Sequence, residues 1–334
     1  MVRRVADAAG RRPGVVERAE HHQVALYVAS IVLGGVAGLL WPASGTLDAA
    51  IEPVLGALLF VTFMTVPFGR IRAAARDTRF LVALGVLNFV LAPAVTFGLS
   101  RFVDGEQSLL IGVLLVLLTP CVDYVIVFTR LAGGASERLL AAAPLLMLTQ
   151  LTLLPLYLWL FAGPDTLATI DVAPFVRAFL LLIALPLGLA VVVQLLGPRT
   201  SIARRVEHVA PAFMVPLMML TLGVVVASQI RAVGSRWTEL WGLVPLYAVF
   251  VVAMLAAGWA TARAARTDAA SSRALIFSGV TRNSLVVLPL ALALPPALSL
   301  APLVVVTQTL VELVAMIVMV RAVPRLVPAE RHVG

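Results

Sequence analysis

The sequence predicts an all-α polytopic membrane protein with ten transmembrane helices, and three observations lead to this fold class. Hydrophobic residues make up 61% of the 334 residues and charged residues only 13%, whereas soluble domains contain about 45–50% apolar and about 25% charged residues. Ten stretches approach the roughly 20 apolar residues that a bilayer-spanning helix needs. Arginines gather in every second connection. This composition excludes a soluble enzyme, a disordered chain and a nucleic-acid-binding domain.

The ten apolar stretches are joined by short connections that leave no room for a soluble domain. The first begins at Val24 and is too long for the apolar part of a signal peptide, so a retained helix is expected. A transporter domain over 24–321 is predicted, between cytoplasmic tails at 1–23 and 322–334. The stretches cover residues 24–42, 52–69, 80–101, 108–131, 139–162, 175–197, 210–229, 239–262, 273–294 and 299–320.

The arginine distribution predicts the orientation in the membrane. All 25 basic residues are Arg; 20 of them lie in the N-terminal segment or in alternate connections, and four lie on the opposite side. Cytoplasmic loops carry an excess of positive charge. Both termini are therefore expected in the cytoplasm. The Arg-rich, Lys-free composition further indicates a bacterial inner membrane.

The stretches divide into two sets of five, over about 24–162 and about 175–321. Because five is odd, a second copy enters the membrane from the opposite side, which gives the inverted repeat common in secondary transporters. The support is positional, since the fourth and ninth stretches are both interrupted at mid-depth.

Several chemistries are excluded by residues that the chain lacks. Without Lys there is no Walker A loop and no Schiff-base chemistry. The four His residues lie in hydrophilic flanks, and one Cys cannot form an intrachain disulfide. Asp123 and Glu312 would form the acid pair of an intramembrane enzyme, but no enzyme motif supports this. The sequence contains no repeated filter segment, so a channel is not indicated. Neither an enzyme nor a bound metal or cofactor is expected.

The fourth stretch is interrupted at Thr119-Pro120-Cys121, with Asp123 close behind. Pro120 lacks an N–H donor and breaks or kinks a helix, which frees carbonyl groups near the bilayer centre. Cys121 lies about 21 Å along the helix from its outer end. A buried Cys is usually a small apolar residue. Its position beside the break and Asp123 also favours contact with a soft, thiol-binding ligand.

The ninth stretch carries a polar break in which Arg282 lies about 15 Å deep. A charge at mid-membrane costs roughly 2.5–3.5 kcal/mol. Because Asp123 and Arg282 occupy corresponding helices, they are expected to face each other or a shared wet cavity; a purely structural ion pair is equally open. The break contains Ser278, Gly279, Thr281, Arg282, Asn283 and Ser284.

The tenth stretch carries Gln308 and Glu312, which share one helix face because they are four residues apart. Glu312 is interpreted as a proton carrier or cation ligand, or alternatively as a buried acid bonded to a neighbouring helix. The remaining polar residues in the stretches are interpreted as contacts between helices. They are Asn88, Gln150, Gln194 and Gln229.

Two segments carry a resemblance to a known family. Thr119-Pro120-Cys121, followed by Val125-Ile126-Val127-Phe128, resembles the fourth helix of arsenite efflux permeases, and Leu310-Val311-Glu312-Leu313 resembles a motif in their tenth helix. The resemblance covers roughly residues 24–321. These permeases share a superfamily with the bile acid:sodium symporters. The resemblance implies a fold with a panel domain and a core domain, in which helices 4 and 9 are unwound where they cross.

The resemblance also implies a mechanism. Cys121 is the expected arsenite-contacting thiol, Glu312 is expected to matter for transport, and proton exchange is the expected coupling. The family carries Asn-rich and acidic residues at the ninth-helix break, whereas residues 274–311 contain no Asp or Glu here. Arg282 at that break disfavours sodium, and Asp123 replaces a residue that is usually small or uncharged. A divergent member is therefore expected, with an anionic substrate held by Arg282.

Two functions remain open from the sequence: export of arsenite, antimonite or a related oxyanion by proton exchange, and symport of an organic anion. In both, the core domain rocks against the panel domain in alternating access. The expected partners are the lipid bilayer, the small-molecule or oxyanion substrate and the proton, with no nucleic acid; the oligomeric state is not predicted. The expected site comprises Pro120, Cys121, Asp123, Arg282, Asn283 and Glu312, supported by Thr119, Thr281, Ser284 and Gln308.

Overall fold

The computed structural model describes residues 23–41, 48–65, 77–122, 124–163, 177, 179–235 and 237–328. Every regular element within these residues is helical, and each predicted stretch contains at least one helix. In chain order the elements are α3 (Gln23–Leu40), α4 (Asp48–Thr65), α6 (Thr78–Val86), η3 (Leu87–Leu91), α7 (Ala92–Ser100), α8 (Gln107–Leu117), α9 (Tyr124–Leu131), α10 (Ser136–Ala162), η4 (Phe179–Ala184), α13 (Leu185–Leu196), α14 (Ser201–Val209), η5 (Ala210–Phe213), α15 (Met214–Ser235), α16 (Trp237–Trp241), α17 (Leu243–Ala264), α18 (Ala269–Val280), α19 (Ser284–Leu292), η6 (Pro296–Leu298) and α20 (Ala301–Leu326).

The helices have the length and polarity of membrane-spanning segments. Among the described residues, five helical runs are long and apolar enough to cross a membrane: Thr78–Ser100, Ser136–Ala162, Ser201–Ser228, Leu243–Ala264 and Pro296–Leu326. Large apolar side chains such as Leu33, Val252 and Val314 are exposed on the surface. Only a lipid environment makes such a surface favourable over many helices. The chain is a multi-pass membrane protein.

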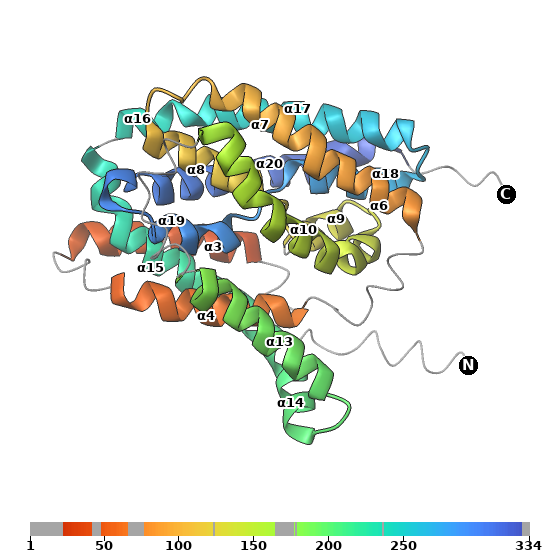
Figure 1. Ribbon diagram of the computed structural model, residues 1–334, viewed down its shortest axis with the longest axis horizontal. Helices are drawn as coiled ribbons and strands as arrows, with labels where there is room; N and C mark the ends of the chain where they lie inside the picture. The colour runs from red at the N-terminus through yellow and green to blue at the C-terminus, as the bar shows by residue number, and fades with distance from the viewer. Residues whose placement is uncertain are drawn as a thin grey trace.

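The helices form two groups (Figure 1). A smaller group contains α3, α4, α13, α14 and α15, with α15 packed along both α3 and α4. A larger group contains α6 to α10 and α17 to α20, in which α17 packs on α18 and α20 packs on α8. The short helix α16 leads from α15 to α17, so it connects the two groups.

Glycines allow α3 and α15 to approach closely within the smaller group. A Cβ added at Gly34 would lie 2.5 Å from the carbonyl oxygen of Gly223, and one added at Gly38 would lie 2.8 Å from the Cα of Ala227. Gly34 and Gly38 are one helical turn apart, the small-residue spacing that brings membrane helices into backbone contact. The smaller group is therefore tightly joined at this crossing.

Two π-helical turns occur in the described chain, and each is followed by a proline in the next helix. The turn η3 precedes Pro93, and η4 precedes Pro186. Pro93 has no N–H to donate to the carbonyl four residues earlier, that of Phe89. The hydroxyl of Tyr157 donates to this carbonyl over 2.5 Å. A side chain from α10 thus satisfies the acceptor that the proline leaves open.

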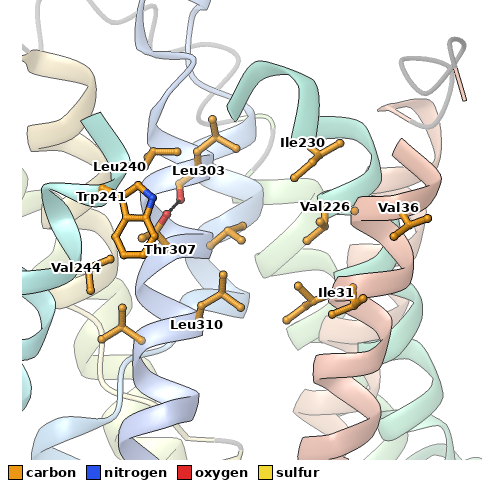
Figure 2. Close-up of a pocket in the computed structure, with 14 residues that line it drawn as sticks. Ile31, Val36, Val226, Ile230, Leu240, Trp241, Val244, Leu303, Thr307 and Leu310 are labelled. Carbon is orange, nitrogen blue, oxygen red and sulfur yellow. Dashed lines mark hydrogen bonds between the residues drawn. The ribbon is translucent and has the colours of Figure 1, made fainter. Parts of the chain in front are cut away.

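A cavity of about 480 Å³ lies between the two groups (Figure 2). Its walls come from α3 and α15 on one side and from α16, α17 and α20 on the other. Thr307 and the Trp241 indole are the polar side chains among otherwise apolar lining residues. A smaller pocket shares Ile31, Val226 and Val306 with this cavity and adds Ser284 and Thr309. The space between the groups therefore extends toward the start of α19.

Candidate functional site at the crossing of two broken helices

The helical breaks predicted in the fourth and ninth stretches are present. The first separates α8 from α9, and the second separates α18 from α19. Pro120 and Arg282 form an isolated antiparallel β-bridge across the two breaks. The backbone N–H of Cys121 donates to the Thr281 carbonyl over 3.2 Å, and that of Asn283 donates to the Thr119 carbonyl over 2.8 Å. The two extended segments thus satisfy each other's backbone groups within the membrane, as lipid surroundings require.

Three side chains at the breaks form hydrogen bonds with backbone groups at the helix ends. The Thr119 hydroxyl donates to the carbonyls of Leu115 and Val116, both over 3.1 Å. The Thr281 hydroxyl likewise donates to a carbonyl one turn earlier, over 2.8 Å. The Asn283 side chain accepts a hydrogen bond from the backbone N–H of Val286 over 3.3 Å, which places it at the cap of α19. Thr119 and Thr281 therefore serve the local fold of the crossing.

Arg282 is fully buried, with 0% exposure, and its guanidinium faces protein oxygens. Its Nη2 donates to the Asn88 side-chain oxygen and to the Ser278 carbonyl, each over 3.0 Å, and also to the Gly279 carbonyl. Its Nη1 donates to the Leu117 carbonyl over 3.4 Å. The guanidinium therefore lies among helix-end carbonyls, and the role of Arg282 as a substrate anchor stays a prediction.

Glu312 reaches the same break from α20 and is 1% exposed. Its Oε2 accepts the backbone N–H of Arg282 over 2.8 Å and a hydrogen bond from the Gln308 side chain. The sequence-based prediction that Gln308 and Glu312 share a face is confirmed. The carboxylate contacts the backbone of Arg282, so α20 is directly connected to the break.

The charges at the crossing match the helix dipoles. The Arg282 guanidinium lies at the C-terminal ends of α8 and α18, where unpaired carbonyls concentrate negative charge. The Glu312 carboxylate binds the chain just before the N-terminus of α19, where the dipole is positive. Each charge is stabilised by the helix end that it faces, which offsets part of the cost of burial in a membrane.

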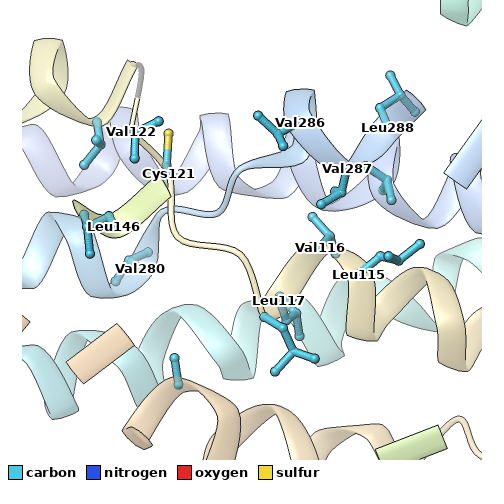
Figure 3. Close-up of a cluster of buried hydrophobic side chains, with 14 of the residues drawn as sticks. Leu115, Val116, Leu117, Cys121, Val122, Leu146, Val280, Val286, Val287 and Leu288 are labelled. Carbon is cyan, nitrogen blue, oxygen red and sulfur yellow. The ribbon is translucent and has the colours of Figure 1, made fainter. Parts of the chain in front are cut away.

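Cys121 lies in the extended segment of the crossing and is 1% exposed. Figure 3 shows its sulfur projecting from this segment beside Val122, within a cluster of apolar side chains that includes Val286. The large cavity and the smaller pocket at Ser284 are lined by other residues. The buried thiol thus lies outside both of these spaces.

Several polar atoms beside the crossing have no hydrogen-bond partner among the described residues. They are Asn283 Nδ2, Ser284 Oγ and Gln308 Oε1. Buried polar atoms are nearly always bonded to protein or to water. Ser284 lines the smaller pocket, whose volume of about 10 Å³ is close to what one water molecule needs, so its hydroxyl is suited to bind water.

Asp123 was predicted to belong to the site, whereas Asn88 was not. Asp123 lies outside the described residues, so its predicted relationship to Arg282 stays a prediction. Asn88 was interpreted as a contact between helices; it does bond Ser278, over 3.0 Å, and it also accepts from Arg282. The polarity of Asn88 within an apolar stretch indicates a hydrogen-bonded residue. The sequence does not identify its partners, because they lie about 190 positions away.

Comparison with known families identifies a relationship over more than half of the chain. The family model of the Sodium Bile acid symporter family matches residues 52–236. The match includes the break between α8 and α9 and ends before α17. No curated protein matches the chain significantly.

Proposed function

Because the chain belongs to the Sodium Bile acid symporter family, we propose that it is a secondary transporter that works by alternating access at the crossing. The smaller group of helices acts as the panel domain and the larger group as the core domain. The cavity between the groups supports this division, because the proposed motion opens and closes a space at their contact. The proposed membrane is the bacterial inner membrane, with both termini in the cytoplasm.

We further propose that the chain consists of two inverted repeats of five transmembrane helices, over about 24–162 and about 175–321. The matching interruptions support this arrangement: α8 and α18 both end at the crossing, and α9 and α19 both begin there. Their bridge is antiparallel, the direction expected when the two halves enter the membrane from opposite sides.

Arsenite, or antimonite, is the proposed substrate, exported by proton exchange. The observation that carries this proposal is the position of Cys121, whose backbone N–H bonds the Thr281 carbonyl across the crossing. A thiol displaces one hydroxyl from As(OH)3, forming an As–S bond and releasing water, with no change of oxidation state. Arsenic(III) prefers soft thiol ligands, and the exchange is reversible, so substrate can be released on the other side.

Glu312 is the proposed proton carrier. Its carboxylate is buried and contacts the backbone of the break through the Arg282 N–H. Protonation removes a charge that holds this N–H, so gain or loss of a proton changes how firmly α20 holds the break. This couples the proton to the movement of the crossing. Asp123 and Ser284 are proposed as further polar residues of the substrate path.

Arsenite accumulation in bacterial cells that lack their own exporters tests the proposal. The cells carry the wild-type chain, Cys121→Ser, Cys121→Ala or an empty vector, at matched membrane expression. Val125→Ala is the control, because it truncates a neighbouring buried side chain and keeps the thiol. Lower accumulation with wild type and Val125→Ala alone supports export through the thiol. Equal accumulation in all cells contradicts it.

The apolar cavity favours a second candidate, symport of an organic anion. The cavity has a volume of about 480 Å³ and is lined almost wholly by apolar side chains. This volume falls within the range of ligand pockets for molecules of many heavy atoms, and it greatly exceeds the volume that arsenite needs. Uptake of radiolabelled taurocholate into proteoliposomes tests this candidate. Val306→Trp fills the cavity and should abolish uptake, whereas Cys121→Ser should leave it unchanged. Absence of wild-type uptake would remove this candidate.

A further inference from the structure

The oxygens around the Arg282 guanidinium are of the kind that hold a sodium ion in transporters. Carbonyls at half-helix C-termini and in unwound segments coordinate such ions. At this crossing, carbonyls of Leu117, Ser278 and Gly279 and the side-chain oxygen of Asn88 all accept from the guanidinium. These four neutral oxygens thus converge on a cation that is part of the protein.

Neighbouring residues hold the acceptor oxygens in position around the guanidinium. The Asn88 amide nitrogen donates to the Leu84 carbonyl over 3.1 Å and to the Ser278 hydroxyl over 3.0 Å. These two bonds turn the amide oxygen toward Arg282. The guanidinium carbon also lies 5.4 Å from the ring centroid of Phe250, within the range of a cation–π contact. A cation is therefore stabilised here on several sides.

A sodium ion does not fit among the same oxygens. It would lie beside the guanidinium, and two like charges repel strongly where water is excluded. Among the described residues, the one buried carboxylate that could balance a second cation is that of Glu312. Its Oε2 already accepts hydrogen bonds from the Arg282 N–H and from Gln308. The name of the family refers to sodium-coupled transport, but the described residues around Arg282 do not provide a site for that ion.

We propose that Arg282 is a tethered cation, whose guanidinium occupies the position of a coupling ion at the crossing and makes the protein independent of sodium. The inference rests on the proposed transporter function and concerns its coupling, whatever the substrate is. A diffusible ion leaves in each cycle and brings the energy of its gradient. A side chain cannot leave, so the tethered cation stabilises the crossing and another ion must drive transport.

Removal of the guanidinium should create a sodium response that the wild type lacks. The full chain is purified in detergent, and its melting temperature is followed by the fluorescence of its five Trp residues. Sodium chloride is titrated against choline chloride at constant ionic strength. Wild type, Arg282→Ala and Arg282→Lys are compared, and millimolar guanidinium chloride is added in a separate series.

Arg273→Ala is the matched control, because Arg273, which lies in α18, is also a buried arginine that binds carbonyls. Its guanidinium donates to Val327 and Ala132, each over 3.0 Å, at the opposite end of the helix from the crossing. Its loss should lower the melting temperature without creating a response to sodium. This separates the loss of any buried arginine from the loss of the cation at the crossing.

The expected result is a wild-type melting temperature that is equal in both salts, and a lower one for Arg282→Ala that sodium raises by at least about 2 °C. Millimolar guanidinium should also raise the melting temperature of Arg282→Ala and not that of wild type. A wild type stabilised by sodium overturns the proposal. A folded Arg282→Ala that responds to neither cation also overturns it.

If Arg282→Ala cannot be purified, Arg282→Lys decides. Its ammonium keeps a fixed cation at the crossing, so the variant should fold and should not respond to sodium; a sodium response contradicts the proposal. These melting measurements need no transported substrate. Failure of arsenite export would therefore leave the result on Arg282 intact, and a sodium response would leave the substrate question open.

Discussion

The carboxylate of Glu312 accepts a hydrogen bond from the backbone N–H of Arg282 over 2.8 Å, so α20 holds the break between α18 and α19 directly. The side chain of Arg282 points to a different set of partners, the helix-end carbonyls and Asn88. One residue thus joins α20 through its backbone and joins α8 and η3 through its side chain. The crossing is assembled from both halves of the sequence.

Glu312→Gln and Glu312→Ala should separate the structural and the proton-carrying parts of this contact. The Gln side chain keeps an oxygen acceptor for the Arg282 N–H, so the variant should fold, whereas Ala leaves a buried donor unpaired at a cost of about 1–3 kcal/mol. Glu312→Gln should still lose pH-driven arsenite transport. Melting curves and transport into everted vesicles measure the two effects. Wild-type transport rates in Glu312→Gln would contradict the role of Glu312 as proton carrier.

Asn88→Ala should destabilise the protein because it removes an acceptor of the Arg282 guanidinium and a donor to Ser278. A charged group that loses a buried partner costs about 1–3 kcal/mol or more. Thr96→Val is the control: Thr96 is equally buried, and its hydroxyl has no hydrogen-bond partner among the described residues. Thermal unfolding in detergent should show a large drop for Asn88→Ala and little change for Thr96→Val. Equal drops would show that the Asn88 bonds contribute little.

Gly38→Val should separate α3 from α15, because a Cβ at Gly38 already meets the Cα of Ala227 at 2.8 Å. Backbone atoms cannot move aside as a flexible side chain can, so a loss of about 1–3 kcal/mol or more is expected. Gly35→Ala is the matched control, since its Cβ would meet only a Val226 methyl at 3.8 Å and an Ile230 methyl at 4.0 Å, both ordinary contacts. Melting temperature and expression level measure both. A stable Gly38→Val would exclude close backbone contact here.

Arg138→Gln should lower stability modestly by releasing two helix starts at once. Arg138 lies 3.0 Å from Asp77, which caps α6, and 3.5 Å from Asp268, which caps α18. The side chains are about half exposed, so a total effect of about 0.5–1 kcal/mol is expected. Melting temperature at neutral pH measures it. A loss several times larger would show that this cluster is less exposed to solvent than it is in the structure.

The same cluster predicts a pH dependence of stability. Partial burial raises the pKa of Asp268, but hydrogen bonds from Ser271 and the charge of Arg138 outweigh it, so the pKa lies below 3.8. Because this pKa is lowered on folding, the stabilisation is complete above the ordinary pKa and is lost as the pH falls through the lowered one. The difference in melting temperature between wild type and Arg138→Gln should stay constant from about pH 8 to about pH 5. It should shrink only in stronger acid.

The sequence predicted those parts of the site that depend on local chemistry. Pro120 and the polar run around Arg282 indicated two breaks, because proline and buried polar groups interrupt a membrane helix. The spacing of Gln308 and Glu312 indicated a shared face. The partners of Arg282 could not be predicted, because Asn88 and Leu117 lie far away in the chain and any buried acceptor satisfies a guanidinium. The role of Cys121 stays a prediction.

The cavity between the two groups was also beyond the sequence. Apolar residues that line it on α3, α15 and α20 have the same composition as those that face lipid or pack in the core. Hydropathy does not distinguish these three surroundings. The two π-helical turns escaped prediction too, although Pro93 and Pro186 were visible, because proline in a membrane helix is accommodated in several ways.

The contacts of Arg282 have a consequence for the order of membrane insertion. Asn88 and Leu117 are synthesised well before Arg282, so two of the four oxygens that accept from its guanidinium precede α18 in the chain. An arginine in an isolated apolar helix meets an energetic barrier to partitioning into lipid. Here the segment around Arg282 can pack against Asn88 and Leu117 as it enters the bilayer, and these contacts offset part of the cost of its charge.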